Sequence, residues 1–176
     1  MKKLSKIFWT GIGLLAVLFV SFASYHSTDS TEVGVRTVKW LGKKGVENQV
    51  YQPGSAYFFL PIFNDWDTFD TRLQVVEMKG SGQLTLKTRD GNDLFVDVTF
   101  SYRIDPQKAP YIRQYVAKSD LEVREKVFKT VARSRTRDFL GALSTDEFTR
   151  TEERNKAVDL AKAGLQSIFD SYGIIL

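Results

Sequence analysis

The side chains that most often carry chemistry are scarce in this sequence. There is one histidine, His26, and there is no cysteine. A serine triad would have to use His26 as its base, and no nucleophile-elbow string surrounds any serine. The absence of cysteine removes disulfides, thiol catalysis and Cys-ligated zinc or iron–sulfur sites. The sequence therefore predicts no catalytic residue, no cofactor and no enzymatic activity.

Three acids, Asp65, Asp67 and Asp70, lie close together around Trp66. Carboxylates in this number could bind calcium weakly, but they lack the glycine-punctuated spacing of an EF-hand loop. We expect them to serve in turns and caps, and we predict no metal site.

Basic residues recur along one predicted helix, interleaved with acids. They are Arg124, Lys126, Lys129, Arg133, Arg135 and Arg137. A solvated helix face is the expected role of such a pattern. Within it, Arg133 and Arg137 are our candidate residues for a contact between subunits.

The net charge of +4 comes from the amino-terminal end. Of the 25 Lys and Arg residues, three precede residue 7, which leaves 22 against 21 Asp and Glu residues. A nucleic-acid-binding protein carries its basic excess on the folded part of the chain. The nearly neutral body therefore argues against nucleic acid as a partner.

Residues 7–25 contain no charge and would span about 28 Å as a helix, close to the hydrocarbon thickness of a bilayer. We predict an uncleaved transmembrane anchor here. The competing interpretation is a signal peptide, since Ser21-Phe22-Ala23 resembles a cleavage site. In both cases the three preceding lysines place the amino terminus in the cytoplasm and the body outside it.

The segment that follows is predicted to form an antiparallel sheet over residues 33–104. The expected strands cover residues 33–40, 46–52, 69–78, 83–88 and 94–104. From Leu94 to Ile104 apolar and polar residues alternate with the period of a half-buried strand. Asp90-Gly91 before this strand indicates a tight hairpin turn.

Residues 105–176 are predicted to be mainly helical, which makes the fold α+β. One helix is expected from Asp120, as its cap, to about Leu140. Capping boxes at Ser144–Glu147 and Thr149–Glu152 introduce a last helix, which Gly173 ends. The final residues begin another strand, so we expect a longer natural chain.

The stretch "PGSAYFFLPIFNDW", residues 53–66, crowds aromatic and aliphatic side chains into one short run. Neighbouring side chains of a strand face opposite ways, so Phe58 and Phe59 enter one core only if both faces are covered. Exposed rings would be an aggregation hazard in water. We predict that part of the run completes the sheet and part enters a bilayer, with Phe59 or Phe63 facing the membrane.

The order of these elements resembles the SPFH family of stomatins, prohibitins, flotillins and bacterial Hfl proteins. The resemblance rests on "EVGV", "QPGSAYFFLPIF", "FDTRLQ" and "LTLKTRDGNDLFVDVTFSYRIDP", and on a prohibitin-like "FDSYGIIL" at the end. It covers about residues 31–176. The coiled coil that follows the domain in this family is absent from this sequence, which is consistent with a truncated chain.

The resemblance implies a scaffold in the cell inner membrane, assembled as a homo-oligomer or with related SPFH subunits into rings or cages. It also implies organisation of membrane microdomains, and an FtsH-type membrane protease as a partner. The proline-bracketed run would contact the lipid bilayer. The candidate membrane-contacting residues are Tyr57, Phe58, Phe59, Leu60, Ile62, Phe63 and Trp66.

The resulting domain plan has four parts. A cytoplasmic tip and transmembrane anchor cover residues 1–25, and a linker covers 26–32. The β-rich first SPFH subdomain covers 33–104, and the helical second subdomain covers 105–176 and is incomplete at its carboxy-terminal end. The alternative function is that of an extracytoplasmic ligand-binding domain, released by signal cleavage, with the aromatic run lining a pocket.

Overall fold

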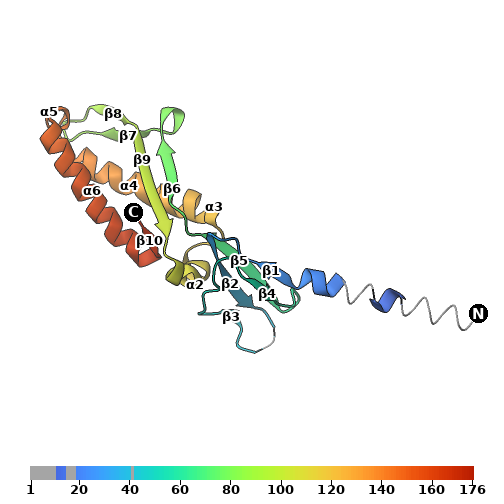
Figure 1. Cartoon of the computed structure of the whole chain (residues 1–176). Coiled ribbons are helices and arrows are strands. Elements are labelled where there is room, and N and C mark those ends of the chain that lie inside the picture. Colours follow the sequence, from blue (N-terminus) through green and yellow to red (C-terminus); the bar gives the residue numbers. More distant parts are fainter. Residues whose placement is uncertain (1–10, 15–18, 41) are drawn as a thin grey trace, which may run out of the picture.

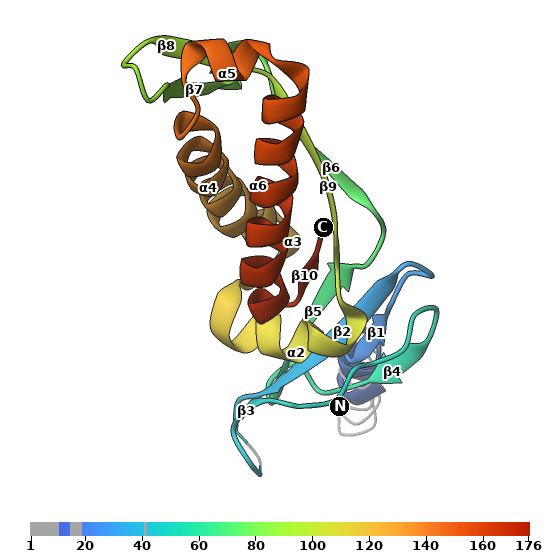
Figure 2. The same cartoon turned by 90° about the vertical axis from the view of Figure 1, so that its left-hand side faces the viewer.

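Strands make up the first part of the folded chain and helices most of the second, in an elongated arrangement (Figure 1). The computed structural model describes residues 11–14, 19–40 and 42–176. The amino-terminal helix leaves one end of the body, and the longest helix, α6 (Thr151–Tyr172), runs along the other part (Figure 2).

Two small antiparallel sheets form the end next to the amino-terminal helix. In the first, β2 (Glu32–Val38) pairs with β5 (Asn64–Asp70) along its whole length and with β3 (Gly45–Val46) on its other edge. In the second, β1 (Tyr25–Ser27) pairs with β4 (Ala56–Phe58). The strand predicted over residues 46–52 is reduced to β3 and a single bridge between Tyr51 and Gly34.

Two further sheets continue the body. The central strand β9 (Val98–Ile104) lies between β6 (Gln74–Met78) and β10 (Ile174–Ile175). The strands β7 (Leu84–Lys87) and β8 (Asp93–Val96) form the predicted hairpin. Gly91 in its turn has a φ of 87°, a conformation that favours glycine.

The α+β class is confirmed, but the prediction of one sheet over residues 33–104 is wrong. The described strands form four separate sheets. The alternating run 94–104 is divided at Asp97 into β8 and β9, which pair with different partners. The alternation of apolar and polar residues therefore continues through two strands that belong to different sheets. The pattern does not show where the first strand ends and the second begins.

Helices cover these sheets in two groups. The first group is short: η2 (Pro106–Lys108), α2 (Ala109–Tyr111) and the π-helical η3 (Ile112–Val116). The second group begins with α3 (Asp120–Glu122), the π-helical η4 (Val123–Phe128) and α4 (Lys129–Gly141), which follow one another without a break. The helix α5 (Thr145–Thr149) leads into α6, and the short η1 (Gly80–Gly82) joins β6 to β7.

The helix ends confirm two of the expected caps and correct two others. Ser144 and Glu147 form the predicted capping box, and Gly173 ends α6 with a φ of 80°. The cap of α3 is Ser119 and not Asp120, because the Ser119 hydroxyl accepts from the Glu122 backbone. No side chain caps α6, so the predicted box at Thr149–Glu152 is wrong.

The largest buried cluster extends through both halves of the body. Tyr102, Phe128 and Phe169 stack with ring centroids 4.2 and 4.7 Å apart, joining β9, η4 and α6. Val33 and Phe69 of the first sheet belong to the same cluster. A subdomain boundary at residue 104 stays a prediction.

The predicted anchor lies partly outside the described residues. Residues 11–14 and 19–23 are helical, whereas 1–10 and 15–18 are not described. Within the described ranges, no helix combines the length and the apolar character needed to cross a bilayer. The described part of the chain therefore does not support the predicted transmembrane helix.

Candidate membrane-contact site

The aromatic run is organised by the sheet β2–β5, both faces of which are covered. Val33 and Val35 of β2, with Phe69 of β5, face the main core. On the opposite face the indole of Trp66 lies against Gly34, where an added Cβ would come within 2.3 Å of two ring carbons. A glycine is therefore required at this position for the indole to pack there.

Five rings gather over this second face and form what we term the aromatic cluster. Its neighbouring centroids lie 4.8–6.3 Å apart, a range typical of favourable ring pairs. The members are His26, Tyr51, Tyr57, Phe59 and Trp66. The sheet β1–β4 therefore packs on β2–β5 through aromatic side chains.

Polar groups close one side of the aromatic cluster. The Arg36 guanidinium lies 4.4 Å from the centroid of Phe59, and its Nε donates to Asn64 at 2.8 Å. The Tyr51 hydroxyl donates to Glu47 at 2.6 Å. Burial raises the pKa of Tyr51 above its ordinary value, and the bond to Glu47 adds to this shift. The hydroxyl therefore stays protonated at neutral pH.

The other half of the run points outward. Side chains alternate along β4 and the residue after it, so Tyr57 and Phe59 lie in the aromatic cluster while Phe58 is 68% exposed. Beyond it Ile62 is 74% exposed, and Leu60 is exposed as well. Tyr25 contacts Phe58 edge-on at 5.5 Å and is itself exposed.

A tryptophan from another loop joins this outward half. Trp40 is 69% exposed and stacks on Phe63, with centroids 6.2 Å apart. We use the name apolar end surface for the five exposed side chains, which are Tyr25, Trp40, Phe58, Leu60 and Ile62.

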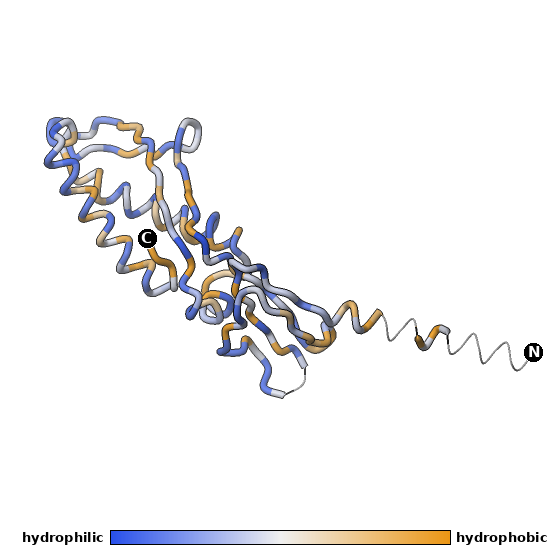
Figure 3. The backbone as a smooth tube through the Cα atoms, viewed as in Figure 1, coloured by the Kyte–Doolittle hydropathy of each residue, from blue (hydrophilic) through white to orange (hydrophobic). Residues whose placement is uncertain are grey.

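The apolar end surface lies where the amino-terminal helix leaves the body. The backbone amide of Phe59 donates to the carbonyl of Ser24 at 2.9 Å, which fixes the end of the helix beside the run. Phe19 and Phe22 of this helix are largely exposed. Figure 3 shows hydrophobic residues in the described helical segments and at the neighbouring end of the body.

The structure therefore divides the seven candidate membrane-contacting residues. Phe58, Leu60 and Ile62 are exposed, and Phe63 is half-buried under Trp40. Tyr57, Phe59 and Trp66 are held in the aromatic cluster. Sequence reasoning passed over Trp40, for which the glycine- and lysine-rich sequence that follows it was the available signal.

The three acids around Trp66 are strand residues with basic partners. Asp65 pairs with Lys39 at 2.5 Å, Asp67 with Arg113 at 2.6 Å and Asp70 with Arg72 at 2.7 Å. Asp70, the last residue of β5, also accepts from the backbone amide of Arg72 at 2.9 Å, which is the turn role that was expected. In the described ranges no group of three His, Cys, Asp or Glu residues could hold a metal ion.

The two candidate interface arginines make contacts within the chain. Arg133 donates to the carbonyl of Gly82 at 3.1 Å, and Arg137 to that of Thr85 at 2.9 Å. Both side chains are exposed and attach α4 to the start of the β7–β8 hairpin. Their role between subunits stays a prediction.

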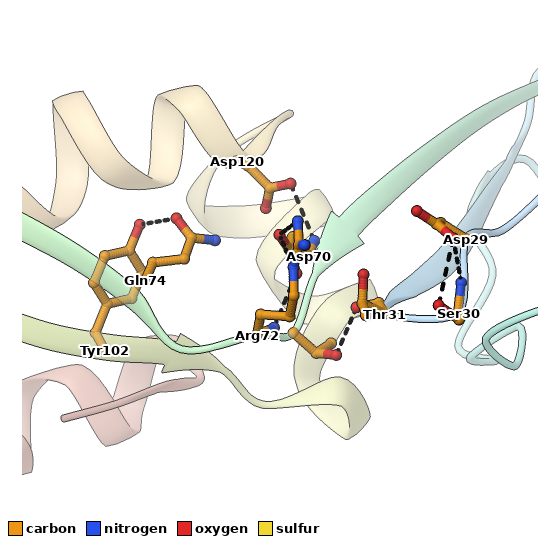
Figure 4. Close-up of polar contacts among 9 residues, drawn as sticks. Asp29, Ser30, Thr31, Asp70, Arg72, Gln74, Tyr102 and Asp120 are labelled. Carbon is orange, nitrogen blue, oxygen red and sulfur yellow. Dashed lines mark hydrogen bonds and ion pairs between the residues drawn. The ribbon is translucent and has the colours of Figure 1, made fainter.

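A polar junction connects the end sheets to the helical part (Figure 4). Asp120 of α3 accepts from the backbone amide of Asp70 at 3.0 Å, while its other carboxylate oxygen is buried without a partner among the described residues. Burial, and to a smaller extent the charges of Asp70 and Glu32, raise the pKa of Asp120 to about 6.

A cavity among the described residues lies away from the aromatic run. It has a volume of about 430 Å³ and is bounded by β9, α4 and α6, with Val98, Leu140 and Leu165 among its lining residues. No member of the aromatic run lines it. The alternative in which the run lines a ligand pocket gains no support from it.

Fold and site together define an α+β domain with an apolar end beside its amino-terminal helix. A family model described as "SPFH domain / Band 7 family" matches residues 26–176. The chain therefore belongs to this family, whose members are in general membrane-associated, non-enzymatic scaffolds. A search of the curated proteins found none that matches the chain.

Proposed function

We propose that this chain is a membrane-anchored scaffold that rests on the bilayer through its apolar end surface. The observation that carries the proposal is that Phe58, Leu60 and Ile62 are exposed in the segment whose Phe59 amide is bonded to Ser24, at the end of the helix that carries the exposed Phe22. A helix entering the membrane would bring these side chains to the interface with no further rearrangement.

Energetic reasoning supports a membrane as the partner of this surface. Burying one large aromatic ring removes about 150–250 Å² from water, and each Å² contributes roughly 25 cal/mol. Tyr25, Trp40 and Phe58 are well suited to an interface, where Trp and Tyr are enriched. An apolar patch of this kind facing water favours aggregation.

The anchor and the topology are part of the same proposal. Residues 7–25 would cross the inner membrane once, with Lys2, Lys3 and Lys6 on the cytoplasmic side and the body on the periplasmic side. Mass spectrometry of the purified protein tests retention of Met1, and a mature chain beginning at Ser24 would establish cleavage instead. Protease protection tests the side of the membrane on which the body lies.

Assembly is the next part of the proposal. We propose a homo-oligomer, or an assembly with related SPFH subunits, that organises membrane microdomains and contacts an FtsH-type membrane protease. Membership of a scaffold family and the exposed basic residues on α4 support it. Single-particle images of the detergent-extracted protein test it, and particles of one subunit only would rule out the ring.

The bilayer contact can be measured directly because the chain has no native cysteine. We would attach a nitroxide to Ile62→Cys in the full chain, reconstituted in lipid nanodiscs, and compare its accessibility to oxygen and to a water-soluble nickel complex. The matched control is Leu160→Cys on α6, at a residue that is also exposed.

The expected result is a label at position 62 that is accessible to oxygen and shielded from nickel, with the reverse at position 160. If both labels were equally accessible to nickel, the apolar end surface would lie in water and the proposed membrane contact would be wrong.

A further inference from the structure

We infer that the apolar end surface has a cationic edge, formed by Lys43 and Lys44, that selects anionic lipid headgroups. This inference rests on the proposed function and specifies which lipids the surface contacts. It concerns the loop between β2 and β3, which sequence reasoning treated only as a connection.

The loop is fastened to the aromatic run by three contacts near its start. The backbone amide of Lys39 donates to the carbonyl of Phe63 at 2.7 Å, and the Lys39 ammonium pairs with Asp65. Trp40 stacks on Phe63. Trp40 is therefore held at the border of the apolar end surface, and Lys43 and Lys44 follow it by three and four residues in the sequence.

The two lysines differ from Arg36 and Lys39 in having no ion-pair partner in the part of the chain that the structure describes. Lys43 and Lys44 are exposed and take part in no ion pair between described residues. The nearby acids are engaged, since Asp65 pairs with Lys39, and Glu47 accepts from Tyr51 and lies 3.7 Å from Arg36. The loop therefore presents two uncompensated positive charges.

The order of Trp40 and the two lysines along the loop fits the order of apolar and charged layers at a bilayer surface. An exposed tryptophan favours the level of the headgroups. Lysine ammonium groups a few residues away then reach phosphates and other anionic groups, and they are attracted to negatively charged leaflets. Gly42 and Gly45, on either side of the lysine pair, both have a positive φ, a conformation that favours glycine.

The experiment uses the nitroxide at Ile62→Cys in the full chain. Nanodiscs are prepared from phosphatidylcholine alone or from phosphatidylcholine mixed with phosphatidylglycerol. We expect deeper immersion of the label in the anionic discs, and loss of this difference in the variant Lys43→Gln/Lys44→Gln. Raising the salt concentration should reduce the same difference, because salt screens exposed charges.

A matched control removes the same charge elsewhere. Lys118→Gln/Lys162→Gln changes two exposed lysines of the helical part and should retain the response to phosphatidylglycerol.

The outcomes separate the two proposals. A label in water in both kinds of disc would overturn the membrane contact itself. If the label lies in the bilayer but its depth does not depend on phosphatidylglycerol, the cationic edge alone is overturned. The same holds if the depth of the label in the Lys43/Lys44 variant still changes with phosphatidylglycerol. In those cases the lysines are solvated surface charges.

Discussion

Gly34 lies under the aromatic cluster, at a position where only a residue without a side chain leaves room for the Trp66 indole. An alanine Cβ would lie 2.2 Å from the Trp66 ring, so the indole would have to move. We expect Gly34→Ala to destabilise the fold by about 1–3 kcal/mol, as overpacked cores do. Near-UV circular dichroism during thermal unfolding in detergent measures the change.

Gly82→Ala is the control for this substitution, because nothing lies within 4 Å of an added Cβ there and its φ is not positive. Equal melting temperatures for the two variants would contradict the packing of Trp66 on Gly34.

Asp120 should make stability depend on pH. Its pKa rises on folding from an ordinary 3.8 to about 6. The folded state therefore holds this proton more tightly, so the stabilisation is complete below pH about 4 and is lost as pH rises through about 6. We expect Asp120→Asn to gain stability relative to the unchanged protein across this window, and the gain to level off above it.

Denaturant unfolding at several pH values measures this gain, with Asp159→Asn, an exposed acid without an ion pair, as the control. A constant difference between Asp120→Asn and the unchanged protein from pH 4 to pH 8 would show that Asp120 does not titrate in this range.

At the scale of elements, the side chains of β4 and of Phe59, which follows it, point alternately toward the aromatic cluster and away from it. Phe59→Ala removes a ring from the aromatic cluster and should cost about 3 kcal/mol of unfolding free energy. Phe58→Ala removes an exposed ring and should cost little in detergent while weakening the bilayer contact. Urea midpoints and the nanodisc label measure the two effects, and the reverse ranking would contradict this assignment of faces.

Local patterns predicted several elements well. Asp90-Gly91 indicated the β7–β8 hairpin, and the alternation up to Ile104 gave the buried face of β9 correctly. Glycine conformation and strand period are local properties, so a single sequence contains them. The helical spacing of apolar residues also located the helix from α3 to α4, although Ser119 provides the cap.

Other features depend on contacts that are distant in sequence. The strand β5 was divided between an aromatic run and an acidic cluster. Two of its acids, Asp65 and Asp67, pair with Lys39 and Arg113 from other segments, and the sequence alone does not show these pairs. The inward position of Phe59 depends on Gly34 leaving room for Trp66. Neither fact can be deduced from residues 53–66 alone.

For the whole molecule, the effect of the basic residues of α4 on assembly can be measured separately from their effect on stability. Arg133 and Arg137 each donate to one carbonyl, and losing such a bond at the surface should cost less than about 1 kcal/mol. If they also contact a neighbouring subunit, Arg133→Ala/Arg137→Ala should reduce assembly size and leave the melting temperature nearly unchanged.

Mass photometry in detergent measures that size, with Arg124→Ala/Arg135→Ala as the control. Unchanged assembly in the first variant would remove these arginines from the interface.

The junction between the end sheets and the helical part has a mechanical consequence. Besides the covalent connection after β5, the two parts share a core through Val33 and Phe69, an Asp67–Arg113 ion pair and an Asp70–Asp120 hydrogen bond. Parts joined at one point can swivel, whereas parts joined at several points rotate together. If the end sheets follow the slope of a bilayer, α6 inclines by the same angle, so local membrane curvature would set the direction in which neighbouring subunits point.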